Sequence, residues 1–417
     1  MYSKSKHFFV LGSVLYLVAL FFFPVQTSLF ISFFSIFFLN RRNYIVIAFI
    51  FSLFFLFYGM AMDPVSYIGD YSRYYLTFYQ PDINILVLGK LYRYLIFQFI
   101  SFFGFEPQLY TGITLFLNFF AILFVSLRFV DIFSKRRKVD FILAFILIVL
   151  LYPSTAIGNY ESMFSFTLVY LALYLFCVGK KKRSLLLLVL APLVHPAAIL
   201  YSAMMLPALL FSRFYKYKTL LSISAFSVIV MFALFPLSFI GSFIVHIQNK
   251  LVFFLTGPWS QYVERRDFEF FIIAFLKFSI LIFCMIRIKK CFYNLDSERI
   301  FPNQKLLLVI GRLYNTAFYI MPIAFLAVFS RTLNERYIYF GLFFFLPIVL
   351  LGIQSYRNKI NRLFIYLSLF LIFALPQNII VFGVLSSKSL TPETLSLNVV
   401  ELLHKEYEKA PPAVGRL

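Results

Sequence analysis

The feature that most constrains this chain is a succession of apolar runs, each about long enough to cross a membrane. Residues 44–60, for example, read YIVIAFIFSLFFLFYGM and contain no charge. Crossing a bilayer as a helix takes about 20 mainly apolar residues, and the gaps between the runs are too short to build a soluble core. The sequence therefore predicts an all-α, polytopic integral membrane protein with about 11–13 transmembrane helices in a single transmembrane domain, 1–417.

Charged residues fix the expected orientation. The net charge of +21 falls in short clusters between the apolar runs, which is the positive-inside pattern of membrane proteins and not a nucleic-acid surface. The clusters predicted to be cytoplasmic include Lys4 and Lys6, Arg41 and Arg42, residues 135–138, 180–183, 213–218, 287–290 and 357–362. The spans between them are then 8–23 and 28–39, 44–60 and 109–133, 141–152 and 162–178, a hairpin within 185–211, 220–245 and 268–286, 305–329 and 337–353, and 363–385.

Two segments do not fit simple spans. If 84–103 crossed the membrane, the basic cluster 135–138 would lie outside, and Lys90 and Arg93 share one helical face. We therefore expect an interfacial amphipathic helix within an outer loop, 61–108. Pro192, His195 and Pro196 interrupt the run 185–211, which predicts a broken or re-entrant hairpin that lines a cavity. A second outer loop is expected at 246–267, and a short outer tail at 386–417.

The polar residues left on the predicted outer face suggest a site. Outer arginines are disfavoured by the positive-inside rule, yet their planar guanidinium groups match the oxygens of a lipid-linked diphosphate. An aspartate such as Asp70 can act as a general base on a sugar hydroxyl, or it can simply pair with Arg73. Tyrosines 71, 74, 75 and 79 can stack on sugars or form the aromatic belt of the interface. His195 is either a core histidine or part of a polar pathway.

Three motifs resemble the Wzy-type O-antigen and capsule polymerases, particularly their EpsG-like branch. The first is D-x-x-x-Y in an outer loop after an early span, here Asp70 to Tyr74 in GDYSRYYLTFY. The second is a basic turn, a hydrophobic half-helix and a histidine before small residues, here GKKKRSLLLLVLAPLVHPAAILY. The third is an arginine-containing outer turn before an aromatic span, here SRTLNERYIYFGLFFF. Where the family commonly has an arginine before the histidine hairpin, this chain has Asn159-Tyr160-Glu161.

The resemblance implies a GT-C-like architecture and an active site that faces the periplasm from the bacterial inner membrane. The implied reaction joins undecaprenyl-diphosphate-linked oligosaccharide units by glycosyl transfer, and a protein that regulates chain length is an expected partner. Asp70 and His195 would be catalytic. The residues expected to bind substrate are Arg73, Tyr74, Asn159, Arg265, Arg266, Arg331 and Arg336. The alternatives are a flippase or transporter of the lipid-linked oligosaccharide, and a GT-C-type glycosyltransferase that uses a lipid-monophosphate sugar donor.

Neither cofactor nor metal is expected from the motifs. A glycine-rich phosphate loop and Cys/His metal-ligand spacings are both absent from the sequence. Departure of the lipid diphosphate would drive the transfer, and no nucleotide would be needed. The expected ligands are therefore the lipid-linked sugar and membrane lipid, without nucleic acid.

The orientation is testable by thiol labelling in whole cells. A membrane-impermeant thiol reagent added outside should label Ser72→Cys in the predicted outer loop. It should not label Ser134→Cys, which precedes a predicted cytoplasmic cluster. Labelling of Ser134→Cys from outside would invert the predicted orientation and move every site residue to the other face.

Overall fold

The computed structural model contains helices and, within the part of the chain that it describes, no strand, which confirms the all-α class. The described residues are 14–39, 42–63, 70–79, 90–133, 138–151, 159–199, 201–203, 205, 279, 282–283, 285–286, 304–326 and 390–406. The predicted spans 220–245, 337–353 and 363–385, the loop 246–267 and most of the span 268–286 lie outside these residues.

Three described helices are long and apolar enough to cross a membrane. They are α3 (Tyr44–Ala61), α7 (Gln108–Phe133) and α10 (Tyr160–Cys177). Their bounds agree with three predicted spans to within a residue or two. Helices of this length and composition are typical of membrane proteins. Other apolar helices are α2 (Pro24–Ser35), which the 3-10 helix η1 (Ile36–Phe38) continues, α8 (Lys138–Leu151) and α18 (Gln304–Leu326).

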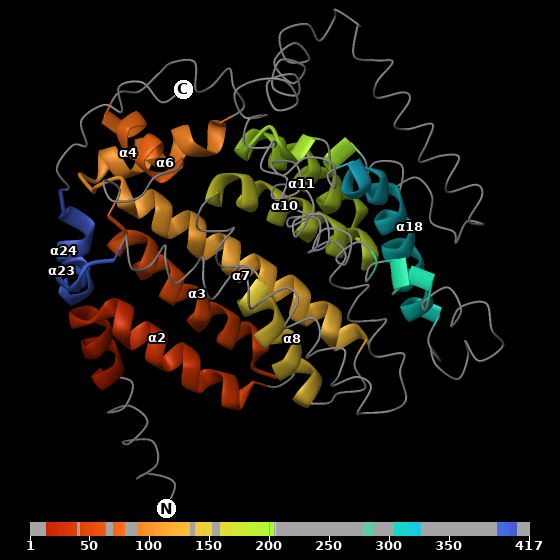
Figure 1. Ribbon diagram of the computed structural model, residues 1–417, viewed down its shortest axis with the longest axis horizontal. Coiled ribbons are helices and arrows are strands. Elements are labelled where there is room, and N and C mark those ends of the chain that lie inside the picture. Colours follow the sequence, from red (N-terminus) through yellow and green to blue (C-terminus); the bar gives the residue numbers. More distant parts are fainter. Residues whose placement is uncertain are drawn as a thin grey trace, which may run out of the picture. The chain divides into compact units, whose positions relative to one another are not determined.

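The chain divides into two compact units. The first comprises Met1–Leu168, Leu190–Ala197 and Phe373–Val414, and the second comprises Val169–Val189, Ala198–Ile372 and Gly415–Leu417. The division falls within α10 and within α11 (Lys181–Val194). The first unit contains α2, α3 and α7, which Figure 1 shows side by side.

Two glycines allow α3 and α7 to pack closely. Gly59 of α3 faces Gly112 of α7, and a Cβ atom built on Gly112 would lie 2.6 Å from the Leu56 carbonyl oxygen. Small residues at a helix crossing let the backbones approach and gain van der Waals contact inside a membrane, where hydrophobic association is weak. Further along the same pair, the rings of Phe55 and Phe119 stack with centroids 3.4 Å apart.

The second helix begins earlier than the sequence predicted. A span was expected from Ser28, but α2 starts at Pro24, directly after a bend at Phe23. Proline suits the first position of a helix because its missing N–H would have no partner there. Thr27 bridges the bend: its N–H donates to the Phe23 carbonyl at 2.9 Å, and its hydroxyl donates to the Ala19 carbonyl at 3.0 Å.

In the second unit, α18 caps the end of α10. Arg312 Nη1 donates to the carbonyl oxygens of Phe176 and Cys177, at 2.9 Å each. The last carbonyls of a helix have no partner within the helix and carry partial negative charge, so a cation there is favourable. The sequence predicted that α10 ends and α18 begins on the same side of the membrane, and this contact joins those two regions.

The glycine contact predicts a large effect from a small substitution. Gly112→Val should lower the free energy of unfolding by about 1–3 kcal/mol or more, because the added carbon atoms would collide with the α3 backbone. Ile113→Val, one residue along on a half-buried position, is the matched control. Thermal unfolding of the purified protein measures both. Equal stability of Gly112→Val and the wild type would contradict the close crossing.

Candidate functional site

Four segments that the sequence predicted to lie on one side of the membrane meet in the first unit. They are α4 (Asp70–Tyr79), α6 (Leu91–Phe102), the first turn of α7 and the first turn of α10. The contacts that join them involve aromatic rings and one buried ion pair. The D-x-x-x-Y motif is the first half of α4, so this junction is the natural candidate site.

Helix α6 is shorter than the predicted segment 84–103 and has the opposite polarity. Its 12 residues extend about 18 Å, too short to cross a bilayer. We expected Arg93 on a solvated face. Instead Arg93 is buried together with Phe97 and Ile100, while Leu95, Phe99, Phe102 and the following Phe103 are exposed. The arginine faces inward because it has a charged partner there, and the apolar side of α6 faces outward.

The partner of Arg93 is Glu161, in the first turn of α10. Arg93 Nε donates to Glu161 Oε1 and Nη2 donates to Oε2, which is the bidentate geometry of a strong pair. The Tyr110 hydroxyl of α7 also donates to Glu161 Oε1. Arg93 is 2% exposed and Glu161 is fully buried. Burial alone would lower the pKa of the Arg93 guanidinium, but the Glu161 carboxylate outweighs burial and raises that pKa, so Arg93 stays charged.

The pair also holds α4 in place. The guanidinium carbon of Arg93 lies 3.8 Å from the centroid of the Tyr74 ring, a cation–π contact. The same ring makes T-shaped contacts with the rings of Tyr160, centroids 5.3 Å apart, and Tyr110, centroids 6.4 Å apart. We predicted that Tyr74 contacts substrate. In the structure it is 3% exposed and packs among these side chains, where it anchors α4.

A second tyrosine anchors the C-terminal end of α4. Tyr79 Oη donates to Glu106, in the loop between α6 and α7. Burial, helped by this hydrogen bond, raises the pKa of Tyr79 far above its ordinary value, so the phenol keeps the proton that it donates. The backbone N–H of Glu106 donates in turn to the Leu403 carbonyl at 3.0 Å. The same glutamate thus connects α4 to the C-terminal segment.

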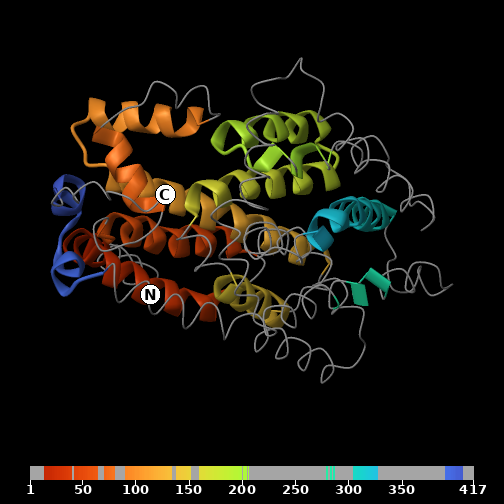
Figure 2. The same cartoon turned by 45° about the horizontal axis from the view of Figure 1, so that its top comes forward.

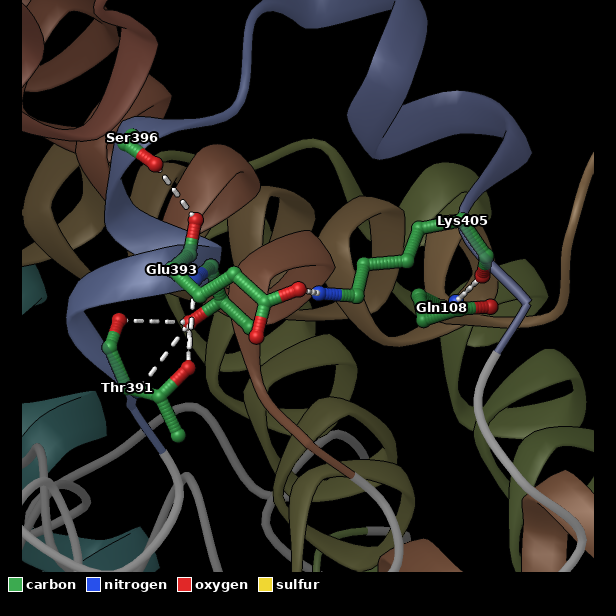
Figure 3. A network of polar contacts seen from close by, with 6 residues as sticks. Gln108, Thr391, Glu393, Ser396 and Lys405 are labelled. Atoms are coloured by element: carbon green, nitrogen blue, oxygen red, sulfur yellow. Dashed lines mark hydrogen bonds and ion pairs between the residues drawn. The ribbon is translucent and has the colours of Figure 1, made fainter.

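The C-terminal segment 390–406 is docked and not a loose tail. It forms α23 (Pro392–Ser396) and α24 (Val399–His404), each with a capping box. Figure 3 shows the ion pair of Glu393 with Lys405 at 3.4 Å, and Gln108 donating to the Lys405 carbonyl. Gln26 at the start of α2 donates to the Leu395 carbonyl at 2.7 Å. Both ribbon views (Figures 1 and 2) show this segment, in blue, beside the start of α2.

A row of polar contacts continues from the ion pair along α7. The Thr111 hydroxyl donates to Tyr160 Oη at 3.4 Å, and the hydroxyls of Thr114 and Tyr92 lie 3.0 Å apart. Deeper along the helices, Thr167 of α10 donates to Asn118 of α7 at 2.5 Å. Hydrogen bonds between helices hold membrane bundles together where the surroundings are apolar.

The structure brings together only some of the predicted site residues. Asp70 and Arg73 share α4 with Tyr74, and the Asn159 carbonyl accepts the Met163 N–H at 3.0 Å, so Asn159 starts α10. α4 and the start of α10 therefore adjoin through Tyr74 and Tyr160. The predicted phosphate ligands lie outside the described residues: Arg265, Arg266, Arg331 and Arg336.

His195 lies where the helical hairpin is interrupted. We expected Pro192 to contribute to the break, but it lies inside α11, which continues to Val194. The interruption falls at residues 195–197 before helix resumes at Ala198. There His195 Nδ1 accepts a hydrogen bond from the Ala197 N–H at 3.2 Å. This bond is local and does not connect His195 to α4.

Sequence reasoning missed the pairing of Arg93 with Glu161 and the anchoring role of Tyr110 and Tyr160. Arg93 was recognised as an unusual charge in an apolar run, and Glu161 as an acidic residue at the start of a span. A positive and a negative charge in apolar surroundings predict each other as partners, so this signal was present. No comparable signal distinguishes Tyr110 and Tyr160 from the other tyrosines, of which the chain has 28 in all.

Comparison of the chain with protein-family models, with curated proteins and with solved structures gives no match. The function must therefore be argued from the residues and their geometry.

The ion pair predicts a characteristic pattern of stability. Arg93→Met should cost about 3–5 kcal/mol, because it leaves the Glu161 carboxylate buried without its cation. Adding Glu161→Gln should recover most of this loss, since no charge then lies buried and the amide oxygen still accepts from Tyr110. The matched control is Thr167→Val, which removes a neutral hydrogen bond between α10 and α7 and should cost about 0.5–2 kcal/mol.

Thermal or denaturant unfolding of the purified variants measures these differences. If Arg93→Met proved as stable as Thr167→Val, Glu161 would not depend on Arg93 to compensate a buried charge, and the prediction would be wrong.

Proposed function

We propose that this protein is a Wzy-type polymerase that joins undecaprenyl-diphosphate-linked oligosaccharide units into O-antigen or capsular polysaccharide at the periplasmic face of the bacterial inner membrane. The observation that carries the proposal is the setting of the D-x-x-x-Y motif. Its tyrosine, Tyr74, is fixed on the buried Arg93–Glu161 pair, and its aspartate, Asp70, stands one helical turn earlier at the first residue of α4.

This setting suits a general base. A catalytic carboxylate must be held within hydrogen-bond reach of the hydroxyl from which it takes a proton. Helix α4 is held at its middle by Tyr74, one turn from Asp70, and at its C-terminal end by Tyr79. Arg73, between Asp70 and Tyr74, adds a cation to the same turn. A short, anchored helix that carries an acid and a cation fits the recognition of a sugar attached to a phosphate.

The proposed step transfers a glycosyl group between two lipid-linked units. The hydroxyl oxygen of the incoming unit attacks the anomeric carbon at the reducing end of the growing chain, and its proton passes to the Asp70 carboxylate. The bond from that carbon to the diphosphate oxygen breaks, and the lipid diphosphate leaves with the electron pair. The four outer arginines, Arg265, Arg266, Arg331 and Arg336, would neutralise this leaving group, and His195 would contact phosphate or sugar.

The exposed apolar side of α6 agrees with a lipid-linked substrate. Leu95, Phe99 and Phe102 are exposed on a helix too short to span, so α6 can lie at the membrane interface beside the head group of the lipid. Such a helix would keep the proposed α4 site at the level of the diphosphate of a lipid carrier.

Substitution of Asp70 tests the role and the class of function together. Asp70→Asn keeps the shape of the side chain but removes the base, so polymerisation should fall by about 10²-fold or more. Cells should then display single repeat units on the surface lipid, seen on a gel of surface polysaccharide beside a blot for equal protein. Long chains of normal abundance would refute the catalytic role of Asp70. Complete absence of surface repeat units would instead indicate a flippase.

A further inference from the structure

We infer that Glu161 is a positioning residue for α4: it orients Arg93, and Arg93 in turn holds the ring of Tyr74 and the helix that bears Asp70 and Arg73. That α4 serves the transfer of sugar units rests on the proposed function. The docking of α4 by Glu161 does not, because it follows from the contacts alone.

Glu161 controls the orientation of the arginine. Both oxygens of its carboxylate are engaged by the guanidinium, through Nε and Nη2. A bidentate pair fixes the plane of the guanidinium as well as its position. The Tyr110 hydroxyl, bonded to Glu161 Oε1, restrains the carboxylate from the side of α7. The carboxylate therefore has little freedom to follow a movement of Arg93.

The orientation of Arg93 decides the place of Tyr74. The guanidinium carbon lies 3.8 Å from the ring centroid, and a cation attracts an aromatic ring most strongly when it lies over the face of the ring. The T-shaped contacts of Tyr74 with Tyr160 and Tyr110 hold the ring further. Since Tyr74 is buried, α4 cannot shift without removing this ring from its place.

The pair is thus more than a bond between α6 and α10. An ion pair that only stabilised the fold could be replaced by apolar or neutral groups at little cost. A pair that positions α4 cannot, because a neutral side chain at position 161 no longer fixes the guanidinium plane. Glu161→Gln alone leaves the Arg93 charge buried without its partner and therefore also lowers stability. The double variant Arg93→Met/Glu161→Gln removes the contact without leaving a buried unpaired charge, and both variants are expected to loosen α4.

Thr77 supplies a reporter of docking. Its side chain is half-buried on α4, so a cysteine there reacts faster with a thiol reagent when α4 leaves its place. With the three native cysteines replaced by alanine, the maleimide reaction of Thr77→Cys is followed in purified protein. Adding Glu161→Gln, alone or together with Arg93→Met, should raise the rate about fivefold or more. Tyr74→Leu should raise it similarly, whereas Tyr74→Phe keeps the ring face and should leave the rate near that of Thr77→Cys alone.

Thr167→Val is the matched control. It removes a hydrogen bond between α7 and α10 but leaves the Arg93–Glu161–Tyr74 contacts intact, and should not change the maleimide rate. A rate that stays unchanged in Glu161→Gln overturns the inference. So does an equal rise in Thr167→Val, because that would reflect general loosening of the helices.

A second experiment measures catalysis. Its substrate is lipid-linked repeat units extracted from cells that lack this protein. Glu161→Gln should lower kcat by about tenfold or more and change KM little, as expected when a reacting group is misplaced. Faster labelling with an unchanged kcat would overturn the positioning role. Failure of the proposed function looks different: Asp70→Asn would then polymerise normally, or the wild type would form no polymer, while the labelling results would stand.

Discussion

Arg93 and Glu161 are 68 residues apart in the sequence, yet the arrangement of the whole candidate site depends on their meeting. Removing two charges from water is costly, and the cost is recovered only when the geometry is good and the remaining hydrogen-bonding capacity is used. Here the contact is bidentate and Tyr110 supplies a further donor. The result ties α6 to α10 and, through Tyr74, ties α4 to both. Without the pair, α6 would present an unpaired arginine and α4 would lose one of its two anchors.

The long apolar helices α3, α7 and α10 provide a rigid base of a different kind. At Gly59 and Gly112 the backbones of α3 and α7 come into direct contact, and Thr167 and Asn118 join α10 to α7. The first turns of α7 and α10, which supply Tyr110, Tyr160 and Glu161, are therefore held at a set separation. The C-terminal segment adds a further support, since Glu106 and Gln108 at the start of α7 bond to its carbonyl oxygens. Precise placement of a short helix such as α4 requires this kind of supporting structure.

Much of the fold could be predicted from hydropathy and charge. The apolar runs at 44–60 and 109–133 give α3 and α7 almost to the residue, because a membrane span has a required length and needs every backbone group bonded within the helix. The polarity of α6 could not be predicted, because whether Arg93 faces water or protein depends on a glutamate far along the chain. The burial of Tyr74 could not be predicted for a related reason: the sequence shows an aromatic residue near a charge, but only packing shows how much of its ring is covered. The start of α2 differed because the bonds of Thr27 across the bend at Phe23 cannot be read from composition.

We propose that the anchored helix α4 serves a glycosyl transfer driven by departure of a lipid diphosphate, and reconstitution of the purified protein would test this proposal. The protein would be placed in liposomes with lipid-linked repeat units and no nucleotide, and both polymer length and released lipid diphosphate would be measured over time. The proposal predicts a ladder of polysaccharide chains, with one lipid diphosphate released for each new linkage. Repeat units that cross the liposome membrane without being joined, or a requirement for an added nucleotide, would contradict it.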